Sequence, residues 1–375
     1  MSKNLFGNLL KNENFFQAST IVEEMAIRVP ERTPFYSTSP TMSWGSAAGF
    51  QSGTIELMYG PKSSGKTMIV LDRIKMNQQL RDDTIQVFVD AEMSMEFEST
   101  IRWMRANGVD TDRVLIIREV DIKKIFEKHI LKDLQLELKE GNVKVDYIAF
   151  DSVQAMSTIS LPTTEKQIKK LSDNDGYTKQ DYGARANYLS RIFAPLRMFC
   201  RDYRIFVTFI GQARSGGADR FGNTIWVTNG GEALYHEVQY RTLVTPAGEP
   251  VFDETTRDAN GNAIQVGHRI KFTFEKNKMA EGHNRKGFCD IAYMKGIINT
   301  ESELAELAPK LGLVETKGAW FYYEDKKFNG KKQFSDFLIE YPDEYDILFT
   351  KVMMAASTNP TTAVEFDKET GEIKE

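Results

Sequence analysis

The segment GPKSSGKT, residues 60–67, constrains the folding of this 375-residue chain more than any other part of its sequence. An apolar, β-branched run at 54–59 leads into it, and a stretch with the apolar spacing of a helix follows. Glycines let the backbone N–H groups of such a turn close around phosphate oxygens, and the start of the helix favours their negative charge. The sequence therefore predicts a strand, a phosphate-binding loop and a helix, with a nucleotide held by Gly60, Pro61, Lys62, Ser63, Ser64, Gly65, Lys66 and Thr67.

Two residues of this loop have expected chemical roles. Lys66 would reach the β- and γ-phosphates of the nucleotide, and the hydroxyl of Thr67 would bind Mg²⁺. A phosphate-binding loop of this kind needs two further groups: an acidic side chain that helps to bind Mg²⁺, and a group that activates the attacking water.

Two predicted strands end in acids that could fill these places. Asp151 ends the buried run 147–151, while Asp90 ends the run 85–90 and is followed by Glu92. Sites in open α/β sheets lie at the carboxyl ends of the strands. Glu92 suits the base that orients a water, and Asp151 suits the Mg²⁺ shell. The alternative interpretation of each acid is that it has no role in a site and lies only where a core strand reaches solvent.

Strand-like and helix-like segments alternate along the chain, which is typical of a parallel sheet covered on both faces. Beyond about residue 231 the segments become hairpin-like. We expect an α/β fold with a mostly parallel, twisted sheet, an antiparallel extension and helices on both faces. The expected strands are 54–59, 85–90, 114–117, 147–151 and 205–210, followed by 241–245, 268–276 and 288–294.

The chain divides into four predicted parts. Prolines interrupt residues 1–40, which we interpret as an N-terminal arm and linker. Residues 41–296 form the core, 297–350 a small α+β C-terminal module, and 351–375 an acidic, flexible tail.

Composition excludes several classes of protein. Two cysteines are too few for a disulfide framework, and the N-terminus lacks the apolar core of a secretory signal. The longest uncharged stretch, 33–55, is too rich in Ser, Thr, Pro and Gly to span a membrane. The four histidines and two cysteines lack the spacing of zinc ligands. We therefore expect a cytosolic protein without a membrane partner.

Seven motifs, in this order, resemble those of the RecA recombinases and their phage relatives, the UvsX proteins. The resemblance extends from about residue 53 to 348 and implies a RecA-like P-loop core with DNA-dependent ATPase activity. The motifs are GPKSSGKT at 60–67, FVDAEMSMEF at 88–97, IAFDSVQA at 148–155, FIGQAR at 209–214, RFGN followed by NGGEAL at 220–234, EKNKMA at 275–280 and GLVETKGAWFYY at 312–323.

The resemblance implies further roles around the nucleotide. Glu92 matches the family's catalytic glutamate, and Gln212 matches the glutamine that contacts the γ-phosphate and relays nucleotide state to a DNA-binding loop. Two lysines match a pair that reaches a neighbouring subunit's phosphates; their alternative is a solvated pair on an edge strand. An aromatic residue sits where the family places one over the adenine, with an acid nearby. These four residues are Lys276, Lys278, Trp103 and Glu96.

Two segments resemble the mobile DNA-binding loops of the family, at about 157–181 and 214–231. Basic side chains can neutralise phosphates, and an aromatic side chain can stack on bases. Phe221 matches the family's wedge between bases; the alternative is a flexible surface loop whose aromatic residues are buried. The implied DNA-binding residues are Lys179, Arg185, Ser190, Arg214, Arg220, Phe221, Asn229, Gly230 and Gly231.

Two positions depart from the family pattern. Asn187 stands where a DNA-contacting arginine is usual, and Arg185 and Arg191 lie near it. His236 replaces an aromatic residue that relays state between subunits, so that relay is expected to differ or to be absent. We assign His236 no catalytic role.

The sequence thus predicts an ATP-dependent DNA strand-exchange protein. It would use ATP and Mg²⁺, polymerise on single-stranded DNA as a helical filament of its own copies, and pair that strand with homologous double-stranded DNA. Its place would be the cytoplasm of a bacterial or phage-infected cell, with single-strand-binding and mediator proteins as further partners. The alternatives are a hexameric DNA helicase or translocase of RecA fold and a non-catalytic RecA-like regulator.

Charge is unevenly distributed along this chain, whose net charge is -5. Residues 165–220 hold 11 Lys and Arg against 6 Asp and Glu, whereas residues 340–375 hold 3 against 9. This segregation predicts a basic face that carries the DNA-facing segments, and an acidic C-terminus that competes with DNA for it.

Overall fold

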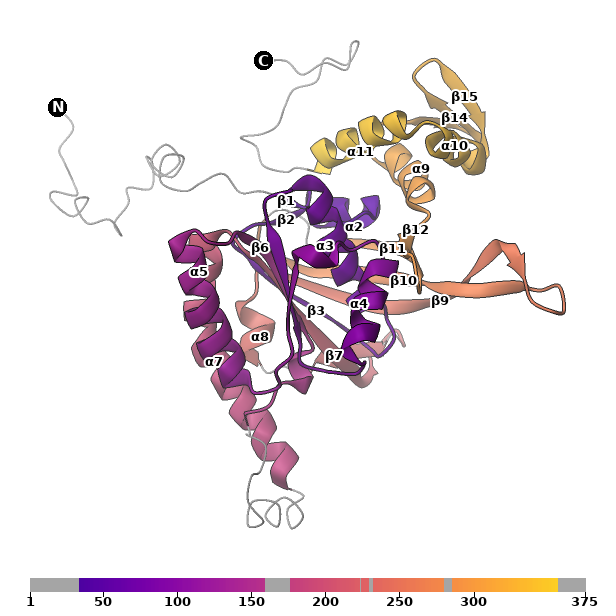
Figure 1. Cartoon of the computed structure of the whole chain (residues 1–375). Helices are drawn as coiled ribbons and strands as arrows, with labels where there is room; N and C mark the ends of the chain where they lie inside the picture. Colours follow the sequence, from indigo (N-terminus) through magenta and orange to yellow (C-terminus); the bar gives the residue numbers. More distant parts are fainter. Residues whose placement is uncertain (1–33, 159–175, 223, 229–231, 280–284, 357–375) are drawn as a thin grey trace, which may run out of the picture. The chain divides into compact units, whose positions relative to one another are not determined.

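The computed structural model describes residues 34–158, 176–222, 224–228, 232–279 and 285–356 (Figure 1). Outside these ranges lie the predicted arm up to residue 33, most of the first DNA-facing segment, residues 229–231 and most of the acidic tail. The expectations stated for those residues therefore stay predictions.

The main sheet of the described residues has ten strands. They are β3 (Ile55–Gly60), β4 (Ile85–Asp90), β5 (Val114–Ile117), β6 (Val145–Asp151), β7 (Phe206–Ala218), β8 (Thr224–Thr228), β9 (Tyr240–Arg257), β10 (Ala263–Asn277), β11 (Lys286–Ala292) and β12 (Gly296–Ile298). Their order is β12-β11-β10-β9-β3-β7-β6-β4-β5, with β8 paired to β7. Neighbours from β9 to β5 run parallel, and neighbours from β9 to β12 run antiparallel. The predicted parallel sheet with an antiparallel extension is confirmed.

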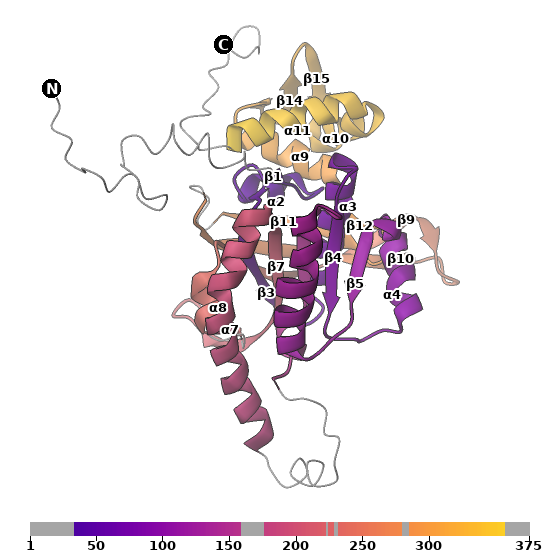
Figure 2. The same cartoon turned by 60° about the vertical axis from the view of Figure 1, so that its left-hand side comes forward.

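Helices cover both faces of this sheet, as predicted (Figure 2). One face carries α3 (Lys66–Leu80) and α4 (Phe97–Ala106). The other carries α7 (Gly176–Tyr203) and the helical segments η3 (Lys124–Leu134) and α5 (Gln135–Glu140). Side chains of the central strands alternate between the two apolar cores, so that Leu57 packs with α7 and η3 while Met58 packs with α3. Because both faces are buried, the central strands read as nearly continuous apolar runs.

Shorter elements complete this part of the chain. Strands β1 (Pro34–Phe35) and β2 (Phe50–Gln51) pair antiparallel. The short helices are α2 (Pro40–Gly45), η2 (Thr111–Arg113), η4 (Val153–Ala155) and α8 (Glu232–Glu237). Within the described ranges, every helix is too short or too polar to cross a membrane.

A buried ion pair joins helix α3 to the sheet. Arg73 of α3 binds the carboxylate of Glu56 in β3, and both side chains are wholly excluded from solvent. Glu56 also accepts hydrogen bonds from the hydroxyl groups of Thr242 in β9, at 2.6 Å, and Thr208 in β7, at 3.0 Å. The guanidinium of Arg73 lies 4.0 Å from the centre of the Phe50 ring. The strand before the phosphate loop and the helix after it are thereby fixed to each other and to both neighbouring strands.

In two places the main sheet extends beyond the strands that the sequence predicts. Strand β7 continues to Ala218 and pairs with β8, so the described part of the segment 214–231 is largely a β-hairpin and not a loop. Strands β9 and β10 form a long ribbon that projects from the sheet (Figure 1). Helix α7 likewise begins at Gly176, inside the first segment predicted as a loop. Backbone pairing places few demands on exposed side chains, so glycine-rich and polar strands carry no apolar pattern to mark them.

The C-terminal module follows the last strand of the sheet. The main sheet ends at Ile298 and α9 begins at Thr300, close to the predicted boundary at residue 296. The module contains α9 (Thr300–Lys310), β13 (Glu315–Lys317), β14 (Trp320–Tyr323), β15 (Lys326–Asn329), α10 (Gly330–Glu340) and α11 (Pro342–Ala356). It has its own apolar core, which includes Leu304, Phe334 and Leu348.

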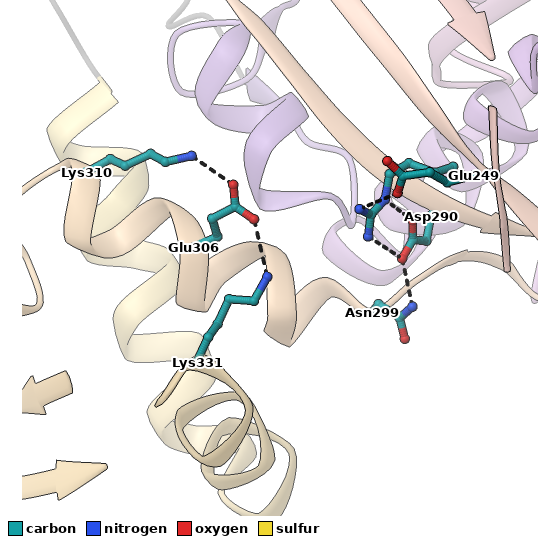
Figure 3. A network of polar contacts seen from close by, with 7 residues as sticks. Glu249, Asp290, Asn299, Glu306, Lys310 and Lys331 are labelled. Carbon is teal, nitrogen blue, oxygen red and sulfur yellow. Dashed lines mark hydrogen bonds and ion pairs between the residues drawn. The ribbon is translucent and has the colours of Figure 1, made fainter. Parts of the chain in front are cut away.

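Polar contacts hold the start of this module to the sheet (Figure 3). Asp290 of β11 accepts hydrogen bonds from Arg269 of β10 at 2.7 Å and from Asn299, just before α9, at 2.9 Å. Arg269 also pairs with Glu249 of β9 at 2.8 Å. Three neighbouring strands are thus linked to the residue that precedes the module. A second group of charged contacts lies within the module and consists of Glu306, Lys310 and Lys331.

We expect Arg73→Met to destabilise the fold by about 3–5 kcal/mol, because it leaves the carboxylate of Glu56 buried without a counter-charge. Adding Glu56→Gln removes that charge and keeps an acceptor for the threonine hydroxyls, so the double variant should recover a large part of the loss. Urea unfolding followed by circular dichroism measures both changes. A double variant no more stable than Arg73→Met would contradict the electrostatic explanation.

Candidate nucleotide-binding site

Strand register brings the predicted acids and the phosphate loop to one edge of the sheet. Gly60 at the end of β3 is in register with Gln212 of β7. Asp90 at the end of β4 is in register with Asp151 at the end of β6. Because β3, β7, β6 and β4 are successive parallel neighbours, their carboxyl ends open at the same edge. Residues from four separate segments therefore meet in one site.

The loop after β3 passes very close to the neighbouring strand. A Cβ atom on Gly60 would lie 1.8 Å from the carbonyl oxygen of Val244 in β9. Gly65, directly before α3, has a φ of 82°, in the left-handed region that glycine adopts without strain. Both glycines of the motif are therefore required by the backbone geometry.

Lys66 directs its ammonium group into the loop. The Nζ atom donates hydrogen bonds to the carbonyl oxygens of Gly60, at 3.1 Å, and Pro61, at 2.6 Å. Burial lowers the pKa of Lys66 to about 8, while the carboxylates of Asp151 and Glu92 act in the opposite direction. A phosphate group in the loop would replace these neutral acceptors with charged ones, which bind an ammonium more strongly.

Thr67 and Asp151 form a second polar pair in the site. The Thr67 Oγ1 atom donates a hydrogen bond to Asp151 Oδ2 at 2.7 Å. Burial raises the pKa of Asp151 to about 6; the hydrogen bond from Thr67 opposes this, and the nearby carboxylate of Glu92 adds to it. Mg²⁺ prefers oxygen ligands, and a dication beside Asp151 would favour its ionised form. A hydroxyl and a carboxylate in contact therefore suit the predicted Mg²⁺ site.

Asp90 and Glu92 have different surroundings. Asp90 is buried, pairs with Arg118 at 3.2 Å and accepts a hydrogen bond from the Met93 N–H at 2.8 Å. Glu92 is exposed, and its Oε1 atom accepts a hydrogen bond from Gln212 Nε2 at 3.0 Å. Asp90 thus holds the chain that leaves β4, and Glu92 is the acid of this strand end that faces the site.

A cavity of about 1040 Å³ lies at this edge of the sheet, large enough for a nucleotide. It is the point at which most of the predicted nucleotide residues come together. Those that line it are residues 62–67, Glu92, Trp103, Asp151 and Gln212.

Aromatic side chains form one wall of this cavity. The indole Nε1 of Trp103 donates a hydrogen bond to the carbonyl oxygen of Tyr293 at 3.3 Å, and both residues line the cavity. The sequence does not indicate a role for Tyr293, because this residue lies in a predicted strand whose alternation marks only burial. Glu96 is exposed just before α4 and does not line the cavity.

The two lysines with a predicted inter-subunit role lie outside the lining of the cavity. Lys276, on β10, donates a hydrogen bond to the carbonyl oxygen of His236. Burial lowers the pKa of Lys276 to about 8, and the positive charges of Lys278 and Arg241 lower it further. Lys278 is exposed. Their contact with another subunit stays a prediction.

The β7–β8 hairpin displays an aromatic side chain at its turn. Phe221 is 74% exposed, and the guanidinium of Arg220 lies 4.7 Å from the centre of its ring. Arg214 is exposed on β7, whereas Trp226 of β8 is half-buried against the core. The alternative in which the aromatic residues of this segment are buried is therefore wrong for Phe221.

Arg185 is not a surface residue. It is 2% exposed, and its Nη1 atom donates hydrogen bonds to the carbonyl oxygens of Gln154 and Met156, both at 2.9 Å. Its predicted contact with DNA is wrong, because its guanidinium is bound to main-chain groups beyond the end of β6. Ser190 is exposed on α7. Outside the described residues and side chains lie Lys179, Asn229, Gly230 and Gly231.

Comparison with known proteins gives a consistent result. A family model described as the RecA N-terminal domain matches residues 34–298, more than half of the chain. The protein named Protein RecA of Mycoplasma mobile is 28% identical over 317 residues, which cover 84% of this chain and 85% of that relative. Proteins of the same name from Lactococcus lactis subsp. cremoris (28% identical, 82% of this chain and 72% of the relative) and a Nocardioides species (29%, 84% and 79%) are also similar.

We expect Gly60→Ala to destabilise the fold and to abolish binding of a fluorescent ATP analogue, because the added methyl group meets a backbone carbonyl that cannot move aside. Gly183→Ala is the matched control: its Cβ, on helix α7, would meet nothing within 4 Å. That substitution should leave analogue binding unchanged and stabilise the helix by roughly 0.5–1 kcal/mol. Normal analogue binding by Gly60→Ala would contradict this loop geometry.

Proposed function

This chain belongs to the RecA family of recombination proteins, and from that premise we propose that it exchanges DNA strands under the control of ATP. It binds ATP with Mg²⁺, polymerises on single-stranded DNA as a helical filament and pairs the bound strand with a homologous duplex. Hydrolysis of ATP then releases the filament from its product.

One observation carries the proposal: strand β7 runs from the nucleotide cavity into the exposed hairpin. Gln212 on this strand contacts Glu92 in the cavity. Phe221, in the turn where the same strand ends, is 74% exposed. A displacement of Gln212 that follows the state of the nucleotide is therefore passed along one continuous backbone to a side chain suited to stack on bases.

Five residues that line the cavity have a task in ATP hydrolysis in this proposal. Lys66 and the backbone N–H groups of the loop hold the phosphates and neutralise their charge. Thr67 and Asp151 would hold Mg²⁺, whose charge would offset the charge that develops on the transferred phosphate. Glu92 orients the attacking water and accepts its proton. Gln212 keeps the carboxylate of Glu92 directed at that water.

Assembly completes the site in this proposal. Burial lowers the pKa of Lys276, the nearby positive charges of Lys278 and Arg241 lower it further, and Glu237 acts in the opposite direction. We call these three basic residues a cluster of positive charge, although Arg241 is also paired with Glu275. An anion facing the cluster relieves the repulsion between its members, and we assign that anion to the phosphates of ATP on the adjacent subunit. Hydrolysis then depends on a neighbour, because the transition-state charge is fully stabilised only at an interface.

The proposed binding of DNA requires no side chain that recognises a particular base. Arg214 and Arg220 neutralise phosphates, and Phe221 stacks on or wedges between bases. Neither kind of contact distinguishes one base from another. Recognition of the homologous sequence is left to base pairing between the strands.

Electron microscopy with ATP and single-stranded DNA, paired with an ATPase assay with and without DNA, tests the proposal against its alternatives. We expect continuous filaments and DNA-stimulated hydrolysis. Discrete hexamers that hydrolyse ATP would instead indicate a helicase or translocase. Binding of DNA without any stimulated hydrolysis would indicate a non-catalytic regulator.

Glu92→Gln should lower DNA-stimulated ATP hydrolysis by at least about a hundredfold, because an amide cannot accept the proton of the attacking water. ATP binding and filament assembly should persist, since the loop and the Mg²⁺ residues are intact. Glu98→Gln, an exposed glutamate on α4, is the matched control and should hydrolyse ATP normally. Normal hydrolysis by Glu92→Gln would refute the assignment of the base.

Phe221→Ala should bind ATP normally but lose most of its strand-exchange activity, and its affinity for single-stranded DNA should fall by about 1–3 kcal/mol, the stacking energy of one base. Fluorescence anisotropy and a strand-exchange assay measure these effects. Phe252→Ala removes another exposed phenylalanine, on the β9–β10 ribbon, and should leave both unchanged. Equal exchange by Phe221→Ala and the wild type would rule out the wedge.

A further inference from the structure

Gln212 lies where strand β7 leaves one neighbour and meets the next. The last residue of β7 in register with β6 is Phe209, which faces Phe150. The first in register with β8 is Ala213, which faces Thr228. Strand β6 ends at Asp151, and the chain then forms η4. Neither β6 nor β8 therefore pairs with the main chain of Gln212.

The side chain of Gln154, in η4, takes the place of that strand neighbour. Its Oε1 atom accepts a hydrogen bond from the Gln212 N–H at 2.8 Å. Its Nε2 atom donates a longer hydrogen bond to the Gln212 carbonyl oxygen at 3.4 Å. One amide group thus pairs with both main-chain groups of a single residue, as an adjacent strand would.

Gln154 is itself held from the opposite side. Its carbonyl oxygen accepts a hydrogen bond from Arg185 of helix α7 at 2.9 Å, and the same guanidinium nitrogen binds the carbonyl oxygen of Met156. Arg185 is 2% exposed, so this anchor is shielded from water. Helix α7 continues from the first predicted DNA-facing segment, and β7 continues into the second. Gln154 therefore contacts Arg185, which lies just beyond the first segment, and Gln212, which lies just before the second.

We infer that Gln154 is a positioning residue that sets the place of Gln212 and couples DNA binding to ATP hydrolysis. By holding the main chain of Gln212, it directs that side chain toward Glu92. By its anchor on Arg185, it ties the same point to helix α7. This inference rests on the proposed function, because it concerns how DNA accelerates hydrolysis at the cavity.

The role requires a donor and an acceptor on one side-chain group of this length. Methionine has a similar length and shape but replaces the amide with a weak acceptor and no donor. An ionised glutamate accepts from the Gln212 N–H but repels its carbonyl oxygen, whereas a protonated glutamate both accepts and donates. The two substitutions Gln154→Met and Gln154→Glu therefore separate the hydrogen bonds from the packing.

The test measures ATP hydrolysis by the full chain with and without single-stranded DNA. Gln154→Met should lower the DNA-stimulated kcat about tenfold, the usual effect of losing such hydrogen bonds, while the KM for ATP changes less than about twofold. The melting temperature should stay close to that of the wild type. Gln135→Met, at a half-buried glutamine of α5 that does not line the cavity, is the control and should match the wild type throughout.

Gln154→Glu supplies a readout that a purely structural role does not change. The Gln212 carbonyl oxygen beside the introduced carboxyl disfavours its ionised form and raises its pKa above the usual value of about 4.3. The variant's DNA-stimulated kcat, relative to the wild type at the same pH, should therefore rise as the pH is lowered from about 8 to about 5.5, because protonation restores the donor. A flat ratio, or a Gln154→Met variant with wild-type stimulated kcat, would overturn the inference and leave the proposed function intact. A wild-type chain without DNA-stimulated hydrolysis would overturn the proposed function, and the inference with it.

Discussion

The buried ion pair between Glu56 and Arg73 is the interaction on which the rest of the site depends. Removing two charges from water costs several kcal/mol per ion, and only a partner in good geometry with further hydrogen bonds offsets it. Here those bonds come from threonines on β7 and β9, the two strands that flank β3. A slip of either strand by one residue would turn its threonine to the other face of the sheet. The pair thus favours a single alignment of the three central strands and of the helix that follows the phosphate loop.

That alignment decides which chemical groups can meet. With β3 and β7 in register, Gly60 and Gln212 lie side by side, and with β4 and β6 in register, Glu92 follows the strand that faces Asp151. The ends of four strands, and the segments that follow them, therefore bring together the oxygens proposed to bind the cation, the proposed base and its amide partner, which lie far apart in sequence. Of these four strands, within the described residues, only β7 continues beyond this edge as a hairpin, so it can connect the cavity to the exposed surface at its turn.

The parts of this arrangement that the sequence predicts are those set by local patterns. The loop GPKSSGKT, the strand ends at Asp90 and Asp151, and the parallel sheet follow from glycine spacing and apolar runs. The resemblance to RecA proteins implies a role for Glu92 and a role for Gln212, but it does not predict the hydrogen bond between them. Contacts between residues distant in sequence could not be predicted. They include the ion pair of Glu56 with Arg73 and the hydrogen bonds between Gln212 and Gln154. They also include the hydrogen bonds of Arg185 to main-chain carbonyl oxygens. The sequence predicts a loop at 214–231, where β7 and β8 form a hairpin, because exposed strands with small residues lack an apolar period.

The contact between Gln212 and Glu92 also sets the scale of any coupling between ATP and DNA. A hydrogen bond of this kind contributes about 0.5–1.5 kcal/mol, and rather more when one partner is charged, so one subunit can change an equilibrium by roughly one order of magnitude. Linkage requires the effect to be reciprocal: on the proposed function, DNA that favours one position of the hairpin must raise the affinity for the matching nucleotide by the same factor. A modest coupling per subunit would become decisive in the proposed filament, where many copies would share one DNA strand and each copy would couple its nucleotide to that strand through its own β7.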